Sequence, residues 1–274
     1  MRRILIAALA FLIWQVPVSI GAQIAVESSM DWGSGLFRVA ARRGLDADMA
    51  PSDHPKALAA LEEELPDRIV AELGRLAWDR RGTLADLVRG RPEALATLEE
   101  LARSMNREWS RLSADQRSVE AVYTLDLSIL TAAMAPSDIR EAPPEVPPGW
   151  IPTPEDGWTG IVVFVPSETP VRGTGLSESP RPALRARILS SELEVLADPA
   201  DTGLFAYGTL DDRRQWEAAA GRRPYQVMAR ELYGRYPCDI ILGEDDTRRL
   251  LAADSGRSAL SEGRIVLLFE GALN

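Results

Sequence analysis

The chain has 274 residues, a formal net charge of −10 at pH 7, one cysteine and one histidine. An acidic surface argues against nucleic acid and anionic membranes as partners, because both bind proteins through basic patches. A single cysteine excludes an internal disulfide, and a single histidine argues against zinc, which usually takes at least three nitrogen or sulfur ligands. We therefore expect neither a metal nor a cofactor.

Residues 1–22 have the pattern of a secretory signal peptide. Two arginines near the start precede an apolar run from Ile4 to Trp14, and small residues end the segment at Ala22. The run is short for a bilayer span, so an uncleaved anchor is the second alternative. We expect export to the periplasm, peripheral to the outer or inner membrane, with no integral span after cleavage.

Residues 23–135 predict a first module that begins with a strand. Phe37, Val39 and Ala41 alternate with other residues over 36–42, which is strand periodicity. Capping residues near Pro55 then start a helix whose apolar stripe has spacings of three and four. Pro66 lies within this stripe and predicts either a kink or two helices in line.

The rest of this module predicts more helix and a hairpin. Short apolar patterns favour helices near 83–88 and from Pro92 to Met105. A weak strand over 107–112 and a clearly alternating one over 119–127 flank a turn, which is typical of a hairpin. The first module is therefore predicted as strand-helix-helix-hairpin, an α+β arrangement.

A proline-rich arm, residues 136–157, joins the first module to a second at 158–274. Its composition predicts a semi-rigid linker. Trp150 and Trp158 lie near its end, and we expect them to dock on their own domain, with partner binding as the second alternative.

The second module is expected to fold around Thr159–Pro166, a β-branched apolar run that predicts a buried central strand. A long loop follows at Ser167–Pro182. Its Gly173 and Gly175 resemble a phosphate-binding loop only weakly, because no third glycine and no Lys-Ser pair accompany them. We interpret it as a hairpin loop and as a candidate interaction surface.

Shorter patterns complete the second module, for which we expect a mostly antiparallel sheet with short helices. Strands are expected near 184–189, 204–207, 224–233, 239–242 and 264–269. Helices are expected near 211–220 and 243–251. Both modules are therefore predicted to be α+β, with about five strands and two short helices in the second.

No catalytic residue is predicted. His54 occupies a helix start, and no Gly-x-Ser-x-Gly elbow accompanies it. Cys238 opens an apolar run and is interpreted as a small buried hydrophobe. A metal-independent hydrolase that uses two carboxylates stays an open third hypothesis, since adjacent acids occur at 155–156, 211–212 and 245–246.

Several segments together resemble a family of uncharacterised exported spirochaete proteins. They are 109–127, the arm at 147–153, 159–163, 181–189, and the tail at 233–241 and 263–267. The second half is also loosely similar to LPP20-type lipoproteins and their flagellum-associated relatives. It departs from them at Phe164-Val165-Pro166, at Arg187, and in having no lipoprotein cysteine. The resemblance implies an envelope protein without catalytic activity, with a link to the flagellar apparatus.

The predicted function is therefore that of a periplasmic structural or interaction protein with an envelope or flagellar partner. The alternative is a small-ligand-binding protein with its site between the two modules. The residues expected to line that ligand or partner surface are Trp150, Trp158, Arg172, Arg185 and Arg187.

Overall fold

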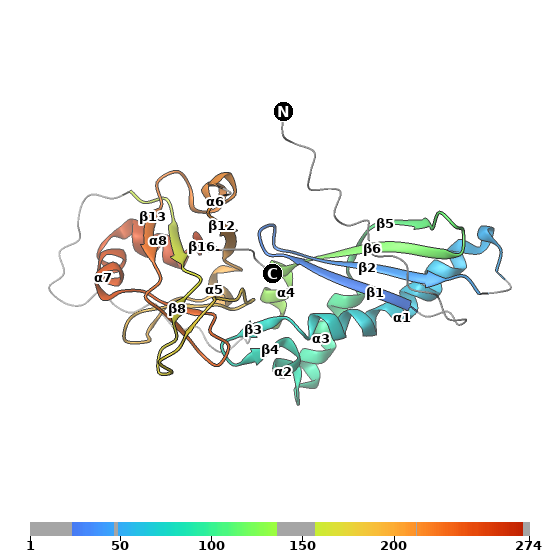
Figure 1. Ribbon diagram of the computed structural model, residues 1–274, viewed down its shortest axis with the longest axis horizontal. Coiled ribbons are helices and arrows are strands. Elements are labelled where there is room, and N and C mark those ends of the chain that lie inside the picture. The colour runs from blue at the N-terminus through green and yellow to red at the C-terminus, as the bar shows by residue number, and fades with distance from the viewer. Residues whose placement is uncertain (1–23, 47–48, 136–156, 212, 271–274) are drawn as a thin grey trace.

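The computed structural model describes residues 24–46, 49–135, 157–211 and 213–270, which fold into two modules along the long axis of the molecule (Figure 1). The first module is coloured blue to green, and the second yellow to red.

A four-stranded antiparallel sheet forms the first module. Its strands, in spatial order, are β1 (Ile24–Asp31), β2 (Leu36–Gly44), β6 (Ser118–Asp126) and β5 (Asn106–Leu112). The predicted alternation in β2 is confirmed, since Phe37, Val39 and Ala41 are all buried. The predictions did not include β1, because its polar centre at 27–29 hides the alternation; pairing with β2 along its whole length defines it.

Helices cover one face of this sheet and one end of it. They are α1 (His54–Leu73), α2 (Leu84–Val88), α3 (Pro92–Arg103) and α4 (Leu127–Met134), and a small hairpin of β3 (Ala77–Asp79) and β4 (Gly82–Thr83) follows α1. A 3-10 turn at Pro51–Asp53 precedes α1. The apolar stripe of α1 contributes Leu61, Leu65 and Ile69 to the core. One helix passes through Pro66, so the chain does not form two helices in line.

The strand predicted to be central in the second module is central. It is β7 (Ile161–Val165), an interior strand of a four-stranded sheet. The spatial order is β12 (Ala206–Thr209), β16 (Ile265–Phe269), β7 and β13 (Tyr225–Met228). All but one of the five β7 side chains are buried, because the two faces of this sheet are both covered.

A second sheet and a hairpin complete this module. The sheet contains β11 (Val195–Ala197), β10 (Ile188–Leu189), β15 (Asp239–Ile241) and β14 (Glu231–Tyr233), in that order. The hairpin is β8 (Thr169–Pro170) with β9 (Ser177–Glu178). The helices are α5 (Pro199–Thr202), α6 (Arg213–Ala220), α7 (Glu244–Ala252) and α8 (Asp254–Ser261).

The α+β class is confirmed, but the second module differs from a mostly antiparallel sheet. All three pairings in the sheet around β7 are parallel. Parallel neighbours need crossover connections, and helices lie in the chain between the paired strands: α6 between β7 and β13, and α6, α7 and α8 between β12 and β16. The single strand expected over 224–233 is divided into β13 and β14, which belong to different sheets.

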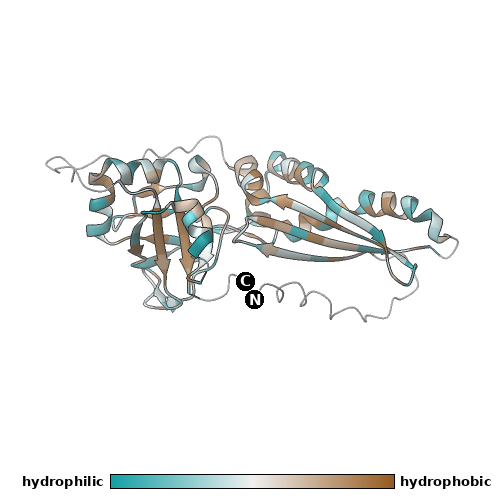
Figure 2. Cartoon of the chain, turned by 90° about the horizontal axis from the view of Figure 1, so that it is seen from above, coloured by the Kyte–Doolittle hydropathy of each residue, from teal (hydrophilic) through white to brown (hydrophobic). Residues whose placement is uncertain are grey.

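The largest buried apolar cluster extends through both modules, from Phe37 in β2 to Leu267 in β16. Figure 2 shows the hydrophobic strands at the centre of each module, with hydrophilic helix faces turned outward. Within the described ranges, no helix combines the length and the apolar composition that crossing a bilayer requires.

Candidate functional site

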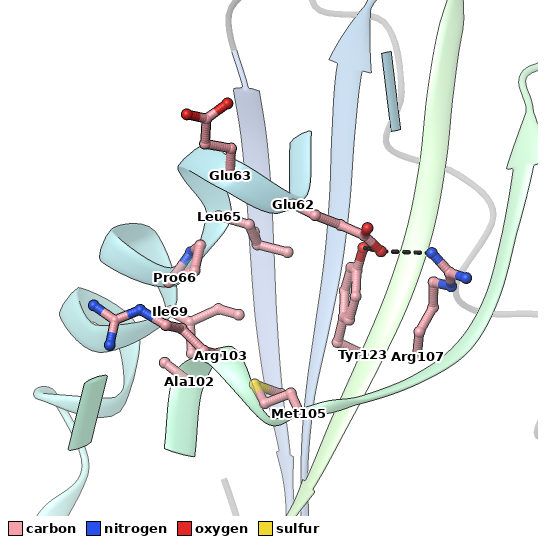
Figure 3. Close-up of a pocket in the computed structure, with 10 residues that line it drawn as sticks. All are labelled: Glu62, Glu63, Leu65, Pro66, Ile69, Ala102, Arg103, Met105, Arg107 and Tyr123. Atoms are coloured by element: carbon pink, nitrogen blue, oxygen red, sulfur yellow. Dashed lines mark hydrogen bonds and ion pairs between the residues drawn. The ribbon is translucent and has the colours of Figure 1, made fainter. Parts of the chain in front are cut away.

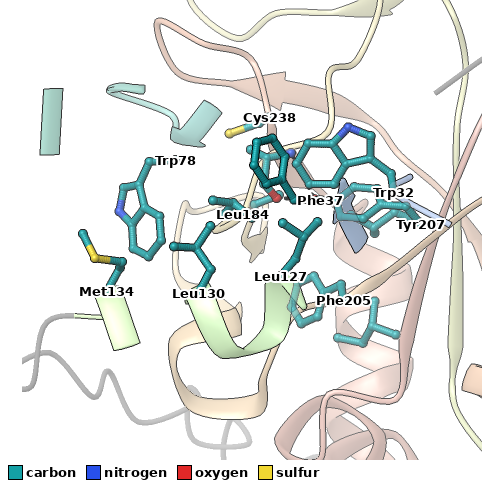
Figure 4. Close-up of a cluster of buried hydrophobic side chains, with 14 of the residues drawn as sticks. Trp32, Phe37, Trp78, Leu127, Leu130, Met134, Leu184, Phe205, Tyr207 and Cys238 are labelled. Carbon is teal, nitrogen blue, oxygen red and sulfur yellow. Dashed lines mark hydrogen bonds between the residues drawn. The ribbon is translucent and has the colours of Figure 1, made fainter. Parts of the chain in front are cut away.

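The junction between the two modules is filled with apolar side chains (Figure 4). Trp78 of β3 and Leu130 of α4, both from the first module, belong to the same buried cluster as Leu184 from the second. Trp32 meets Tyr207 across the junction, with ring centroids 5.2 Å apart in an edge-to-face arrangement. These large side chains fill the space that a ligand between the modules would need.

Backbone hydrogen bonds also join the modules. The amide of Leu184 donates to the carbonyl of Ala77 at 3.0 Å, and the amide of Arg185 donates to that of Trp78 at 2.7 Å. The turn at residues 184–185 is therefore tied to the backbone of β3 across the junction. Since apolar burial is combined with directional bonds, the two modules are held in one relative orientation.

A buried carboxylate gives the junction its polar element. Asp239 of β15 has a fully buried side chain, and its Oδ2 accepts from Arg80 Nη1 at 3.1 Å and from Arg187 Nη2 at 2.9 Å. Arg80 comes from the first module and Arg187 from the second. Burial raises the pKa of Asp239 to about 7, although Arg187 acts in the opposite direction.

Cys238 lies beside this carboxylate and is buried. Burial raises the pKa of its thiol, so the thiolate needed for nucleophilic attack is disfavoured.

The three predicted arginines each form an ion pair with a carboxylate of the second module. Arg185 forms a buried bidentate pair with Asp198, at 2.9 and 2.7 Å. Arg187 binds Asp239, as described above. Arg172 donates to Glu231 at 2.6 Å and to the carbonyl of Ser191. Each of the three guanidinium groups is therefore paired with a carboxylate of its own. The role of the three arginines toward a ligand or partner stays a prediction.

Of the two predicted tryptophans, the structure describes Trp158 but not Trp150. Trp158 is half-buried and packs against Tyr225, with ring centroids 4.5 Å apart. It therefore contacts its own module, as expected. Trp150 lies outside the described residues, so its placement stays a prediction.

A cavity of about 420 Å³ lies within the first module, between α1, α3 and the strands β5 and β6 (Figure 3). Its volume falls in the range typical of small-molecule pockets. The lining side chains are Glu62, Glu63, Leu65, Pro66, Ile69, Ala102, Arg103, Met105, Arg107 and Tyr123.

One hydrogen-bonded triad forms the polar wall of this cavity. Oε1 of Glu62 accepts from Arg107 Nη1 at 2.5 Å and from the Tyr123 hydroxyl at 3.1 Å. Burial, together with the negative charge of Glu62, raises the pKa of Tyr123, so its hydroxyl remains a donor. The triad orients one carboxylate beside an aliphatic floor, which suits an amphipathic ligand. Sequence reasoning missed it because its members are far apart along the chain.

Acidic side chains and the single histidine are the remaining candidates for metal binding or acid-base chemistry. Among the residues that the structure describes, no three His, Cys, Asp or Glu side chains gather closely enough to hold a metal ion. His54 is exposed at the first position of α1. Of the adjacent acids at 245–246, Asp246 accepts from the Tyr225 hydroxyl at 2.6 Å, which is a structural contact. The pair at 155–156 lies outside the described residues.

Two family models match the chain, one for each module. Residues 23–133 match the model described as Treponema pallidum Tp0624, N-terminal domain, and residues 160–271 match the model of the second domain of the same protein. Together the matched segments cover most of the chain, in the order of that protein's domains. No curated protein matches the chain.

Proposed function

Because this chain belongs to the spirochaete family that shares these two Tp0624 domains, we propose that it is an exported structural or interaction protein of the cell envelope without catalytic activity. Export is proposed from the signal-peptide pattern of residues 1–22. A location in the periplasm, peripheral to the outer or inner membrane, follows from export. Association with the flagellar apparatus is the most specific part of the proposal. It comes only from the resemblance of the second half of the chain to LPP20-type lipoproteins and their flagellum-associated relatives.

The observation that supports this proposal is that buried side chains fill the junction between the two modules. A protein that closes two domains around a ligand needs an open cleft and a hinge. Here Trp78 and Leu184 are buried in the shared core, and Asp239 is bound by arginines from both modules. A body of this kind presents surfaces from both modules in a fixed relation, which suits a scaffold or an adaptor.

The test is partner capture from cells after cross-linking, with the chain tagged and the envelope fraction compared with the cytoplasm. We expect the chain in the envelope fraction and cross-linked to a protein found there. A Leu130→Ala variant, whose α4 side chain belongs to the buried cluster across the junction, is expected to stay folded but to capture less partner. A cytoplasmic location, or a clean capture without any envelope protein, would argue decisively against the proposal.

The second candidate function is binding of a small amphipathic ligand, and the cavity beside Tyr123 supports it. Its test is a thermal-shift screen of amphipathic metabolites. An Ala102→Leu variant, which adds volume to the lining, serves as the matched control. A compound that stabilises the wild type but not this variant would support the second candidate, whereas no hit in a broad screen would remove it.

A further inference from the structure

We propose that two hairpin tips, one from each module, form a docking surface for a short acidic segment of a partner protein. The first tip is the Arg80-Arg81 turn between β3 and β4, and the second is the Gly234–Tyr236 turn that follows β14. We call them the paired tips. This inference rests on the proposed interaction function and names the surface and the kind of partner.

The paired tips are in direct contact. The amide of Tyr236 donates to the carbonyl of Arg80 at 3.0 Å, and the Arg80 guanidinium lies 5.3 Å from the centre of the Tyr233 ring. Gly234 has a φ of +115°, and a Cβ added there would lie 2.3 Å from the Cβ of Arg80. Only glycine allows this approach, so the two turns are built to meet at a fixed distance.

Charge is unevenly balanced on this surface. Arg80 is engaged by Asp239, Asp79 accepts from the backbone amide of Arg81, and Asp86 accepts from Thr83. Arg81 and Arg235 are both exposed. Within the described ranges, the Arg81 guanidinium has no ion-pair partner, and Arg235 acts on Asp86 only as a minor electrostatic influence. The paired tips therefore present two available cations in a chain whose net charge is −10.

The available groups favour carboxylates on a compact ligand. Guanidinium groups bind carboxylates through two parallel hydrogen bonds. Interactions between exposed charges are screened beyond about 8–10 Å at physiological ionic strength, so a short segment senses mainly the paired tips. An anionic membrane would instead face a wide area of an acidic protein. We therefore assign the surface to an acidic segment of a protein rather than to a lipid surface.

The experiment measures binding of a fluorescent eight-residue peptide that alternates Glu and Ser, with a Gln-for-Glu peptide as the uncharged probe. Fluorescence anisotropy with the full chain is expected to show binding of the acidic peptide only, and weaker binding as salt is raised. The Arg81→Ala/Arg235→Ala variant is expected to bind about tenfold or more weakly, since each charged hydrogen-bonding contact is worth roughly that factor. Arg68→Ala, an exposed arginine on α1, is the matched control and should bind as the wild type does.

The outcomes separate this inference from the proposed function. Equal binding by the double variant and the wild type, or no binding of the acidic peptide, overturns the paired tips as a docking surface. Sedimentation with anionic vesicles that is lost in the double variant, without peptide binding, assigns the surface to lipid and also overturns the inference. An unchanged melting temperature of the double variant excludes unfolding as the cause of lost binding. Envelope capture that persists in the double variant leaves the proposed function standing.

Discussion

Replacing Asp239 tests whether the buried carboxylate holds the modules together. Its side chain is fully buried and accepts hydrogen bonds from Arg80 Nη1 at 3.1 Å, and from the backbone amide, Nε and Nη2 of Arg187 at 3.1, 3.2 and 2.9 Å. Asp239→Ala removes every one of these acceptors. Two largely buried guanidinium groups, one from each module, are then left without their carboxylate.

The expected cost is about 3–5 kcal/mol, the range for breaking a buried ion pair by removing one partner. This is a large part of the roughly 5–15 kcal/mol that stabilises a typical folded domain. Asp239→Asn keeps one carbonyl acceptor and the side-chain shape, so we expect it to lose less. Glu217→Ala, which removes the helical pair with Arg213, is the control, and an exposed pair of this kind contributes at most about 0.5 kcal/mol.

Urea unfolding, followed by circular dichroism and by tryptophan fluorescence, measures the effect. Trp32 and Trp78, two of the seven tryptophans, are buried at the junction, so its separation contributes to the fluorescence change, whereas circular dichroism reports the helices. For the wild type we expect coincident transitions. Asp239→Ala should lower the midpoint by about 1–2 M urea. A loss smaller than about 1 kcal/mol would refute the importance assigned to this carboxylate.

The pH dependence of the same site gives a second test. Burial raises the pKa of Asp239 to about 7 from the ordinary 3.8, while Arg80, Arg187, Asp79 and Cys238 surround it. The folded state therefore binds the proton more tightly than the unfolded state. The contribution of this proton to the free energy of unfolding is complete below about pH 3.8 and declines as the pH rises to about 7. The stability of the wild type relative to Asp239→Asn should fall across this window. A rise instead would mean that the two arginines outweigh burial.

Two further changes probe the cavity and the core. Tyr123→Phe removes the hydrogen bond to Glu62 and should cost about 1 kcal/mol in thermal or urea unfolding, with no change in secondary structure; a neutral effect would contradict a formed triad. Gly160→Ala places a Cβ 2.6 Å from the carbonyl oxygen of Ala220, so overpacking should cost about 1–3 kcal/mol. Gly157→Ala meets nothing within 4 Å and should stay within about 0.5 kcal/mol of the wild type, and equal effects of the two changes would sink this explanation.

The sequence by itself determined the local elements. The alternation in β2 and β6 and the stripe of α1 depend on side chains two, three or four residues apart, and these periods follow directly from strand and helix geometry. The central strand β7 was also predictable, because a strand covered on both faces needs an unbroken β-branched apolar run. The interpretation of Ser167–Pro182 as a hairpin loop is wrong, because β7 and β10, the strands on either side of it, belong to different sheets. The segment instead contains a small hairpin of its own, β8 with β9.

Only the tertiary structure decided which elements pair and which charges meet. The neighbours of β7 are β13 and β16, far along the chain, and no local pattern states that they run parallel to it. The cavity triad joins Glu62 to residues 45 and 61 positions away. Arg187 was predicted to line a ligand or partner surface, and no local pattern predicts its pairing with Asp239, 52 positions away. Long-range pairing of this kind depends on how elements distant along the chain pack within each module, which periodicity does not record.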